Sequence, residues 1–156
     1  MSMSLLRHAV ATLAYRGGKA VRSAPPEFAD YRPSATSRTP LEILAHVNDL
    51  LDWMDGFLTG VHKWQASVPG TWTDEVTRFH AALARVDQRL ASPLPADVSL
   101  ERLFQGPVAD ALTHVGQLTL LRRMAGAPVR GENYYVADIE AGRVGPDQIP
   151  ARREFD

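Results

Sequence analysis

Residues 39–59 read TPLEILAHVNDLLDWMDGFLT and contain the clearest helix signal in the chain. Thr39 offers an N-cap hydroxyl, Pro40 suits the first helical position, and Glu42 stands where a capping box needs its carboxylate. Apolar residues then recur at steps of three and four until Gly60, which can end a helix. The stretch predicts an amphipathic helix whose start is fixed by its own sequence.

Three further segments have the same helical spacing of apolar residues, and they cover residues 4–22, 73–90 and 106–126. The third helix is expected to open at the sequence Thr-Asp-Glu, and the fourth at a Gly-Pro pair that follows a short helical piece over residues 99–104. No long alternating run of β-branched residues supports a sheet. The pattern predicts an all-α fold, a four-helix bundle with long connections.

Residues 127–156 are rich in Pro and Gly and have no sustained period. We expect them to form an extended C-terminal tail packed on the bundle of residues 1–126, within one domain. The basic pair Arg122-Arg123 is expected to interact favourably with the dipole at the end of the last helix and with a tail carboxylate such as Glu132 or Asp138.

The composition narrows the classes of partner. The chain has 17 basic and 18 acidic residues, so its net charge of -1 gives no reason to expect nucleic acid or an anionic membrane as a partner. It contains no cysteine, so cysteine-based catalysis is excluded and any reacting thiol has to come with the substrate. Neither a signal sequence nor a transmembrane stretch is apparent, and we expect a cytoplasmic protein.

Residues 110–118, DALTHVGQL, place a carboxylate and an imidazole one helical turn apart. In a helix Asp110 and His114 share one face, with their Cβ atoms roughly 6 Å apart, and Gln117 follows on the same side. His46, on the helix of residues 39–59, is the candidate that completes a three-ligand cluster. Two imidazoles and one carboxylate would leave a divalent ion with open positions, and the spacing does not distinguish Zn²⁺, Ni²⁺, Fe²⁺ and Mn²⁺.

Simpler roles are open for the same residues. Asp110 can interact favourably with the positive end of its helix dipole, and His114 can be a hydrogen-bonded core residue. Gln117 can orient a ligand or satisfy a backbone carbonyl. If Asp110 is not a ligand, His80 is the substitute. The three tryptophans are expected as core or lid contacts.

Residues 39–46 and 110–118 together resemble the DinB-like family, which includes the YfiT-type proteins, and the resemblance covers most of residues 1 to 126. It implies a four-helix bundle, frequently a homodimer, with a divalent metal held by one histidine of the second helix and two, spaced H-x-x-x-H, of the last. His46 and His114 match two of these histidines. Asp110 stands where the family pattern has the other one.

The resemblance implies a metal-dependent enzyme, and characterised relatives include transferases that activate a low-molecular-weight thiol such as bacillithiol or mycothiol. In such an enzyme a metal-bound thiolate attacks a small electrophilic substrate. The alternative from a different class is a non-catalytic bundle that binds a small ligand or a partner chain. In that case Asp110 and His114 form only a hydrogen-bonded pair, beside a degenerate or empty metal site.

Overall fold

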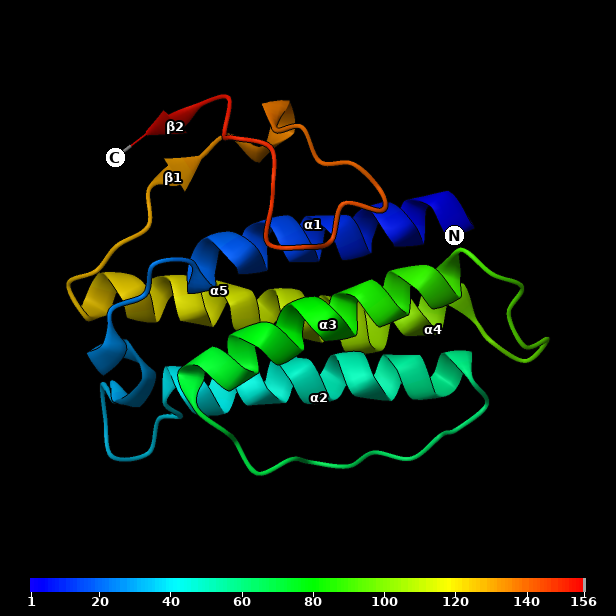
Figure 1. Cartoon of the computed structure of the whole chain (residues 1–156), viewed down its shortest axis with the longest axis horizontal. Coiled ribbons are helices and arrows are strands. Elements are labelled where there is room, and N and C mark those ends of the chain that lie inside the picture. The colour runs from blue at the N-terminus through cyan, green and yellow to red at the C-terminus, as the bar shows by residue number, and fades with distance from the viewer. Residues whose placement is uncertain (156) are drawn as a thin grey trace.

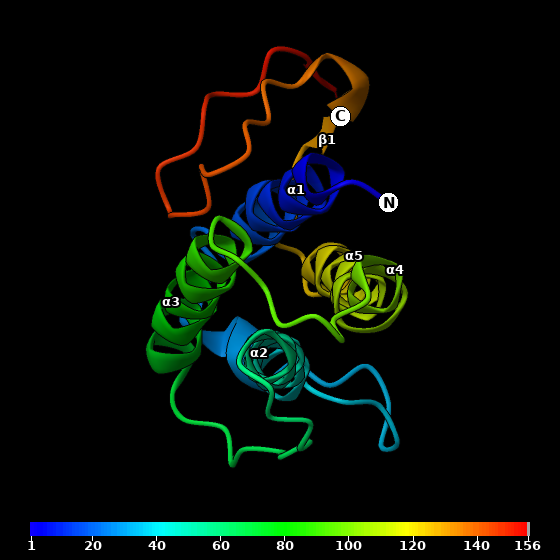
Figure 2. The same cartoon turned by 90° about the vertical axis from the view of Figure 1, so that its right-hand side faces the viewer.

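Four long helices form the core of the computed structural model, which describes residues 1–155. α2 packs against α3 and α5, and α1 packs against the same two helices (Figures 1 and 2). The all-α prediction is confirmed, and none of the helices in residues 1–155 is long and apolar enough to cross a membrane. The long helices are α1 (Met3–Val21), α2 (Pro40–Leu58), α3 (Trp72–Leu90) and α5 (Ala109–Met124).

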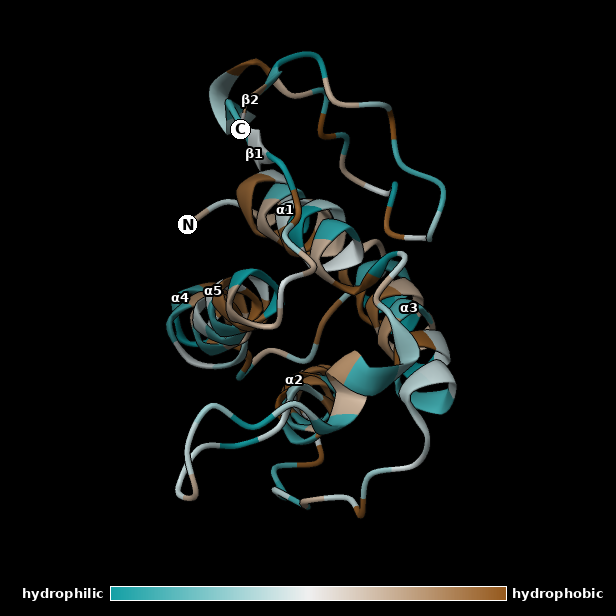
Figure 3. Ribbon diagram, turned by 90° about the vertical axis from the view of Figure 1, so that its left-hand side faces the viewer, coloured by the Kyte–Doolittle hydropathy of each residue, from teal (hydrophilic) through white to brown (hydrophobic). Residues whose placement is uncertain are grey.

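Apolar side chains from all four long helices fill the space between them. Hydrophobic stripes run along the helices, whereas the connection before α2 is mostly hydrophilic (Figure 3). Burial of these stripes is the main force that holds the helices together. The largest fully buried side chains include Leu6 and Leu13 of α1, Leu51 and Met54 of α2, Phe79 and Leu83 of α3, and Leu118 of α5.

Two of the helices begin with capping boxes. The Thr39 hydroxyl accepts a hydrogen bond of 3.2 Å from the backbone N–H of Glu42, whose carboxylate accepts one of 2.7 Å from the Thr39 N–H, as predicted. α3 begins earlier than predicted, because its N-cap is Thr71 and not Thr73. Asp74 takes the N3 position of that box, and the earlier box brings the intervening tryptophan into the first turn of the helix.

The short helical piece before α5 was predicted correctly, but the start of the fourth long helix was predicted wrongly. Instead of a new helix at Gly106-Pro107, one continuous helical stretch runs through α4 (Leu100–Leu103), the π-helical turn η2 (Phe104–Val108) and α5. Pro107 has no N–H and would clash with the carbonyl four residues earlier in an α-helix. The wider π turn accommodates the proline, so the chain bulges and does not break.

The C-terminal segment lies along the outer side of α1 (Figure 1). It contains a two-stranded antiparallel ladder, β1 (Gly131–Glu132) with β2 (Glu154–Phe155), which the sequence did not predict because each strand has only two residues. The carboxylate of Glu132 is buried and accepts hydrogen bonds of 2.6 Å from the Tyr15 hydroxyl and 2.8 Å from the Lys19 ammonium. These contacts join the segment to α1.

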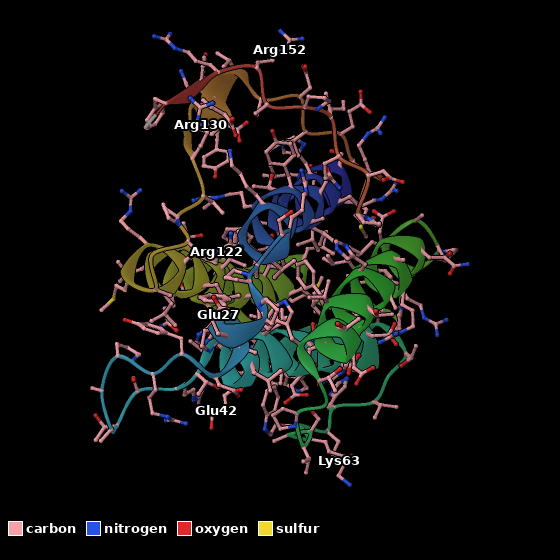
Figure 4. The ribbon with its side chains drawn as sticks, turned by 60° about the vertical axis from the view of Figure 1, so that its left-hand side comes forward. Glu27, Glu42, Lys63, Arg122, Arg130 and Arg152 are labelled. Carbon is pink, nitrogen blue, oxygen red and sulfur yellow. The ribbon has the colours of Figure 1, made fainter. Side chains whose placement is uncertain are left out.

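Arg122 corrects another expectation. Its guanidinium is buried between α5 and the end of α1 (Figure 4), where it donates hydrogen bonds of 3.1 Å to the carbonyls of Ala20 and Arg22. It makes no ion pair within residues 1–155, and Glu132 pairs with Lys19 in its place. Arg122 therefore satisfies the free carbonyls at the C-terminus of α1, and burial lowers the pKa of its guanidinium.

The buried imidazole of His80, on α3, should make the stability of the fold depend on pH. Its Nδ1 atom is buried without a hydrogen-bond partner, and burial lowers the pKa of the imidazole below 6.5 in the folded protein. The unfolded chain therefore binds a proton more readily, so this contribution to stability is complete above about pH 6.5 and is lost as the pH falls. We expect His80→Gln to weaken the fall of the urea midpoint between pH 7 and pH 5. His8→Gln on the exposed face of α1 is the control, and an equal fall in wild type and His80→Gln would contradict the assignment.

Candidate metal centre

Three side chains from two helices converge at one point between α2 and α5. His46 comes from the first half of α2, and Asp110 and His114 stand one turn apart at the start of α5. One nitrogen of each imidazole and one carboxylate oxygen all lie within 4.8 Å of one another, so the group could hold a metal ion. The structure thus brings together the three residues that the sequence selected.

The distances within this cluster are too long for good hydrogen bonds. Asp110 Oδ1 lies 3.4 Å from Nε2 of His114, and Asp110 Oδ2 lies 3.9 Å from Nε2 of His46. An N–H···O hydrogen bond normally spans about 2.7–3.2 Å, whereas two ligands on a tetrahedral ion at about 2.0–2.1 Å are separated by roughly 3.3 Å. The distance between Asp110 and His114 matches two ligands of one ion, and His46 would have to move closer to share that ion.

Gln117 determines which nitrogen of His114 faces the cluster. Its Oε1 atom lies 2.9 Å from Nδ1 of His114. Because a carbonyl oxygen only accepts, this contact keeps a proton on Nδ1 and leaves the lone pair of Nε2 directed at Asp110. Metal-binding histidines commonly have such a partner on the second nitrogen, which fixes the ring and its tautomer.

His46 is held neutral by its surroundings. Burial lowers the pKa of its imidazole, and the nearby His114 and Arg38 lower it further; these effects outweigh the carboxylates of Asp110 and Asp49, which raise it. Its ring stands perpendicular to that of His114, with 4.7 Å between the centroids, and meets the edge of Trp64 at 5.6 Å. A neutral imidazole is the form that binds a metal ion.

Two aromatic residues beside the cluster were not assigned to it from the sequence. Trp53 lies on α2 seven residues after His46 and therefore on the same face, and this spacing is the signal that could have shown it. Trp64 comes from the connection between α2 and α3, and its ring meets that of Trp53 at 5.5 Å. The two indoles form an apolar wall next to His46.

Hydrogen bonds tie the connection that carries Trp64 to α2 and α3. The N–H of Ser67 donates to the carboxylate of Asp49 at 3.1 Å, and the N–H of Gly70 donates to that of Glu75 at 3.0 Å. In Figure 4 the labelled Lys63 marks this connection below α2. Two buried carboxylates thus hold in place the backbone of the connection that carries Trp64.

His80, the predicted substitute for Asp110, lies away from the cluster. Its ring packs beside Phe79 at 5.2 Å, and its Cε1 atom faces Gly18 of α1. The cluster therefore consists of His46, Asp110 and His114 among the residues that the structure describes.

Open space adjoins the cluster on the side of Asp110, whose side chain is 47% exposed. A pocket of about 390 Å³ is lined there by Trp53 of α2 and by Asp110 and Thr113 of α5. An ion held by the three side chains would therefore be accessible to a small molecule. In comparisons with protein-family models, curated proteins and solved structures, nothing matches this chain.

Proposed function

We propose that His46, Asp110 and His114 bind a divalent metal ion, Zn²⁺, Ni²⁺, Fe²⁺ or Mn²⁺, and that the protein is a metal-dependent enzyme of the DinB-like kind. The observation that carries the proposal is the convergence of two imidazoles and a carboxylate whose facing atoms all lie within 4.8 Å of one another, with no hydrogen bond between them. The partner of His114 on its other nitrogen and the neutral state of His46 support it.

The scaffold belongs to the same proposal. We infer that α1, α2, α3 and α5 form the four-helix bundle of residues 1–126, with residues 127–156 as a tail of the same domain, of which Asp156 lies outside the described residues. Bundles of this kind build their sites from side chains of facing helices, as α2 and α5 do here. The resemblance also carries the expectation of a homodimer, which light scattering coupled to gel filtration would test.

The proposed reaction is transfer of a low-molecular-weight thiol to a small electrophilic substrate. A divalent ion supplies thiolate at neutral pH by lowering the pKa of a bound thiol. His46, Asp110 and His114 would hold the ion, Gln117 would keep His114 in its binding tautomer, and the indole wall would exclude water from one side. Since the chain has no cysteine, the nucleophilic sulfur has to enter with the substrate.

The test is metal-dependent thermal stability of untagged protein stripped of metal. A metal ion that binds only the folded state stabilises that state by about 2.7 kcal/mol when its concentration is a hundred times its Kd. In a chain of this size that corresponds to a rise of roughly 5–10 °C in Tm. We expect this rise with Zn²⁺ or Ni²⁺ and its loss in His46→Ala.

The control is His8→Ala, which removes a histidine from the exposed face of α1 and should keep the full rise. If neither Zn²⁺, Ni²⁺, Fe²⁺ nor Mn²⁺ raises the Tm of wild-type protein, the metal centre is wrong and the non-catalytic ligand-binding bundle remains.

A further inference from the structure

A groove leads away from the proposed metal centre along α2. Two adjoining pockets, of about 390 and 410 Å³, share Trp53, Gln105 and Gly106, and the smaller one reaches Asp110. Each is within the usual size of a small-molecule site. We call the pair the α2–α4 groove, because the larger pocket lies between the end of α2 and the α4–η2 stretch, where its other lining residues include Phe57, Asp97, Arg102 and Leu103.

The π turn before α5 keeps the groove open. Gly106 lies in that turn and lines both pockets. A Cβ atom built on Gly106 would have no other atom within 4 Å, so the space beside it is empty. The bulge that accommodates Pro107 therefore also places a residue without a side chain where the two pockets meet. π turns in α-helices frequently occur at functional sites.

The inner wall of the larger pocket is aromatic and apolar. The rings of Trp53 and Phe57 lie 4.9 Å apart with a tilt of 51°, and Leu103 beside them is buried. Aromatic side chains in such positions favour a ligand ring in an offset or edge-on arrangement. The wall therefore indicates a ligand with an aromatic body.

One cation at the groove has no partner. The guanidinium of Arg102 forms neither a hydrogen bond nor an ion pair with any residue of 1–155, although it lines the larger pocket. Planar guanidinium groups bind carboxylates through two parallel hydrogen bonds. Asp97, the carboxylate that lines the same pocket, would accept a hydrogen bond from a ligand hydroxyl or N–H group.

We propose that the α2–α4 groove binds an aryl carboxylate, with its ring against Trp53 and Phe57 and its carboxylate on Arg102. Arg102 and Asp110 are eight residues apart in one helical stretch, or roughly 12 Å along the axis. A molecule of that length would reach the metal centre at its other end. The claim that this ligand is the substrate rests on the proposed function. The claim that the groove binds it does not.

The experiment is an NMR titration of metal-free protein with phenylbutyrate, phenylbutanol and phenylbutylamine, which share the aryl body and differ in charge. We expect phenylbutyrate to shift the Trp53 indole N–H and the Gly106 amide, and to bind about tenfold more tightly than the alcohol, because it alone pairs with a guanidinium. Arg102→Gln should remove this preference. Equal binding of the three probes, or an unchanged preference in Arg102→Gln, would overturn the proposal.

A matched pair of glycine variants tests the place of binding. Gly106→Leu fills the groove, and we expect it to lower the affinity for phenylbutyrate by more than about tenfold. Gly116→Leu makes the same change at an exposed glycine of α5 that also has open space around it, and it should bind like wild type. Native-like spectra of both variants show that the fold is kept, and wild-type affinity in Gly106→Leu would place the ligand elsewhere.

The two proposals fail separately. If phenylbutyrate binds but no added metal raises the Tm, the proposed function is wrong and the groove remains as a ligand site. A metal-dependent rise in Tm together with no shift at Trp53 or Gly106 would keep the metal centre and overturn the groove proposal.

Discussion

Arg78→Met is expected to lower the free energy of unfolding by about 3–5 kcal/mol, the cost of leaving buried charges without their partner. The guanidinium of Arg78, on α3, donates hydrogen bonds of 2.6 Å to Asp49 and 2.6 Å to Asp52, and it lies 3.4 Å from the carboxylate of Glu75. Asp49 and Glu75 are each only 4% exposed. Without the cation, both carboxylates stay buried in a site that no longer balances their charge.

The pKa of Arg78 shows the same balance. Burial lowers it, but the hydrogen bonds and charges of Asp49 and Asp52 outweigh burial and raise it above the ordinary value. The guanidinium therefore remains charged at any pH at which the protein is folded. The destabilisation of Arg78→Met is expected to persist across the neutral range.

Urea unfolding measures this effect, and Arg85→Met is its matched control. Arg85 lies on the same face of α3 and pairs with Asp52 and Asp55, but its side chain is 45% exposed. An exposed pair contributes about 0–1 kcal/mol, so the same substitution should cost little there. Equal costs for the two variants would show that the carboxylates near Arg78 find other partners or water.

The Arg78 cluster also connects the fold to the metal centre. Asp49 and Glu75 each accept a backbone N–H from the connection between α2 and α3, and that connection places Trp64 beside His46. We therefore expect faster amide hydrogen exchange at Ser67 and Gly70 in Arg78→Met. Unchanged exchange there would confine the role of the cluster to the packing of α2 on α3.

Features of the fold that depend on neighbours in sequence were predictable. The capping box at Thr39 and the stop at Gly60, with φ of +81°, follow from local hydrogen bonding and backbone geometry. The region around Pro107 was not, because whether a proline breaks a helix or is taken up by a π turn depends on what packs around it. The partner of Glu132 likewise depends on where the tail crosses α1.

The residues of the candidate metal centre were predictable for the same reason. Asp110 and His114 are one turn apart within one helix, so their common face is a local property. His46 was selected as a histidine on the second amphipathic helix, and the resemblance matched it to a histidine of the family pattern. Trp64 lies on the connection between α2 and α3, and only the path of the chain brings it to the cluster. Arg102 was missed because the sequence predicted a break at Gly106-Pro107, whereas one continuous helical stretch carries both Arg102 and Asp110. Sequence periodicity identifies a face of a helix, but not what a connection places against it.

In the proposed metal centre Asp110 is the ligand that distinguishes between metals. Asp110→His is expected to raise the affinity for Zn²⁺ and Ni²⁺ by about tenfold to a hundredfold, while the affinity for Mn²⁺ stays unchanged or falls. Imidazole suits the first two ions, whereas carboxylate suits Mn²⁺. Asp110 is 47% exposed, so the larger ring can be placed without disturbing the core.

Asp110→Ala should instead lower the affinity for all three ions, because it leaves two protein ligands. Asp110→Asn separates the loss of charge from the loss of the ligand atom. Competition titrations against a chelator of known affinity measure each variant. Equal Zn²⁺ affinities for wild type, Asp110→His and Asp110→Ala would remove Asp110 from the coordination sphere. A reversal of the preference between Zn²⁺ and Mn²⁺ by this one substitution would mean that the carboxylate tunes a working site to a harder ion. In that case the carboxylate at position 110 changes the metal preference of the site and does not abolish binding.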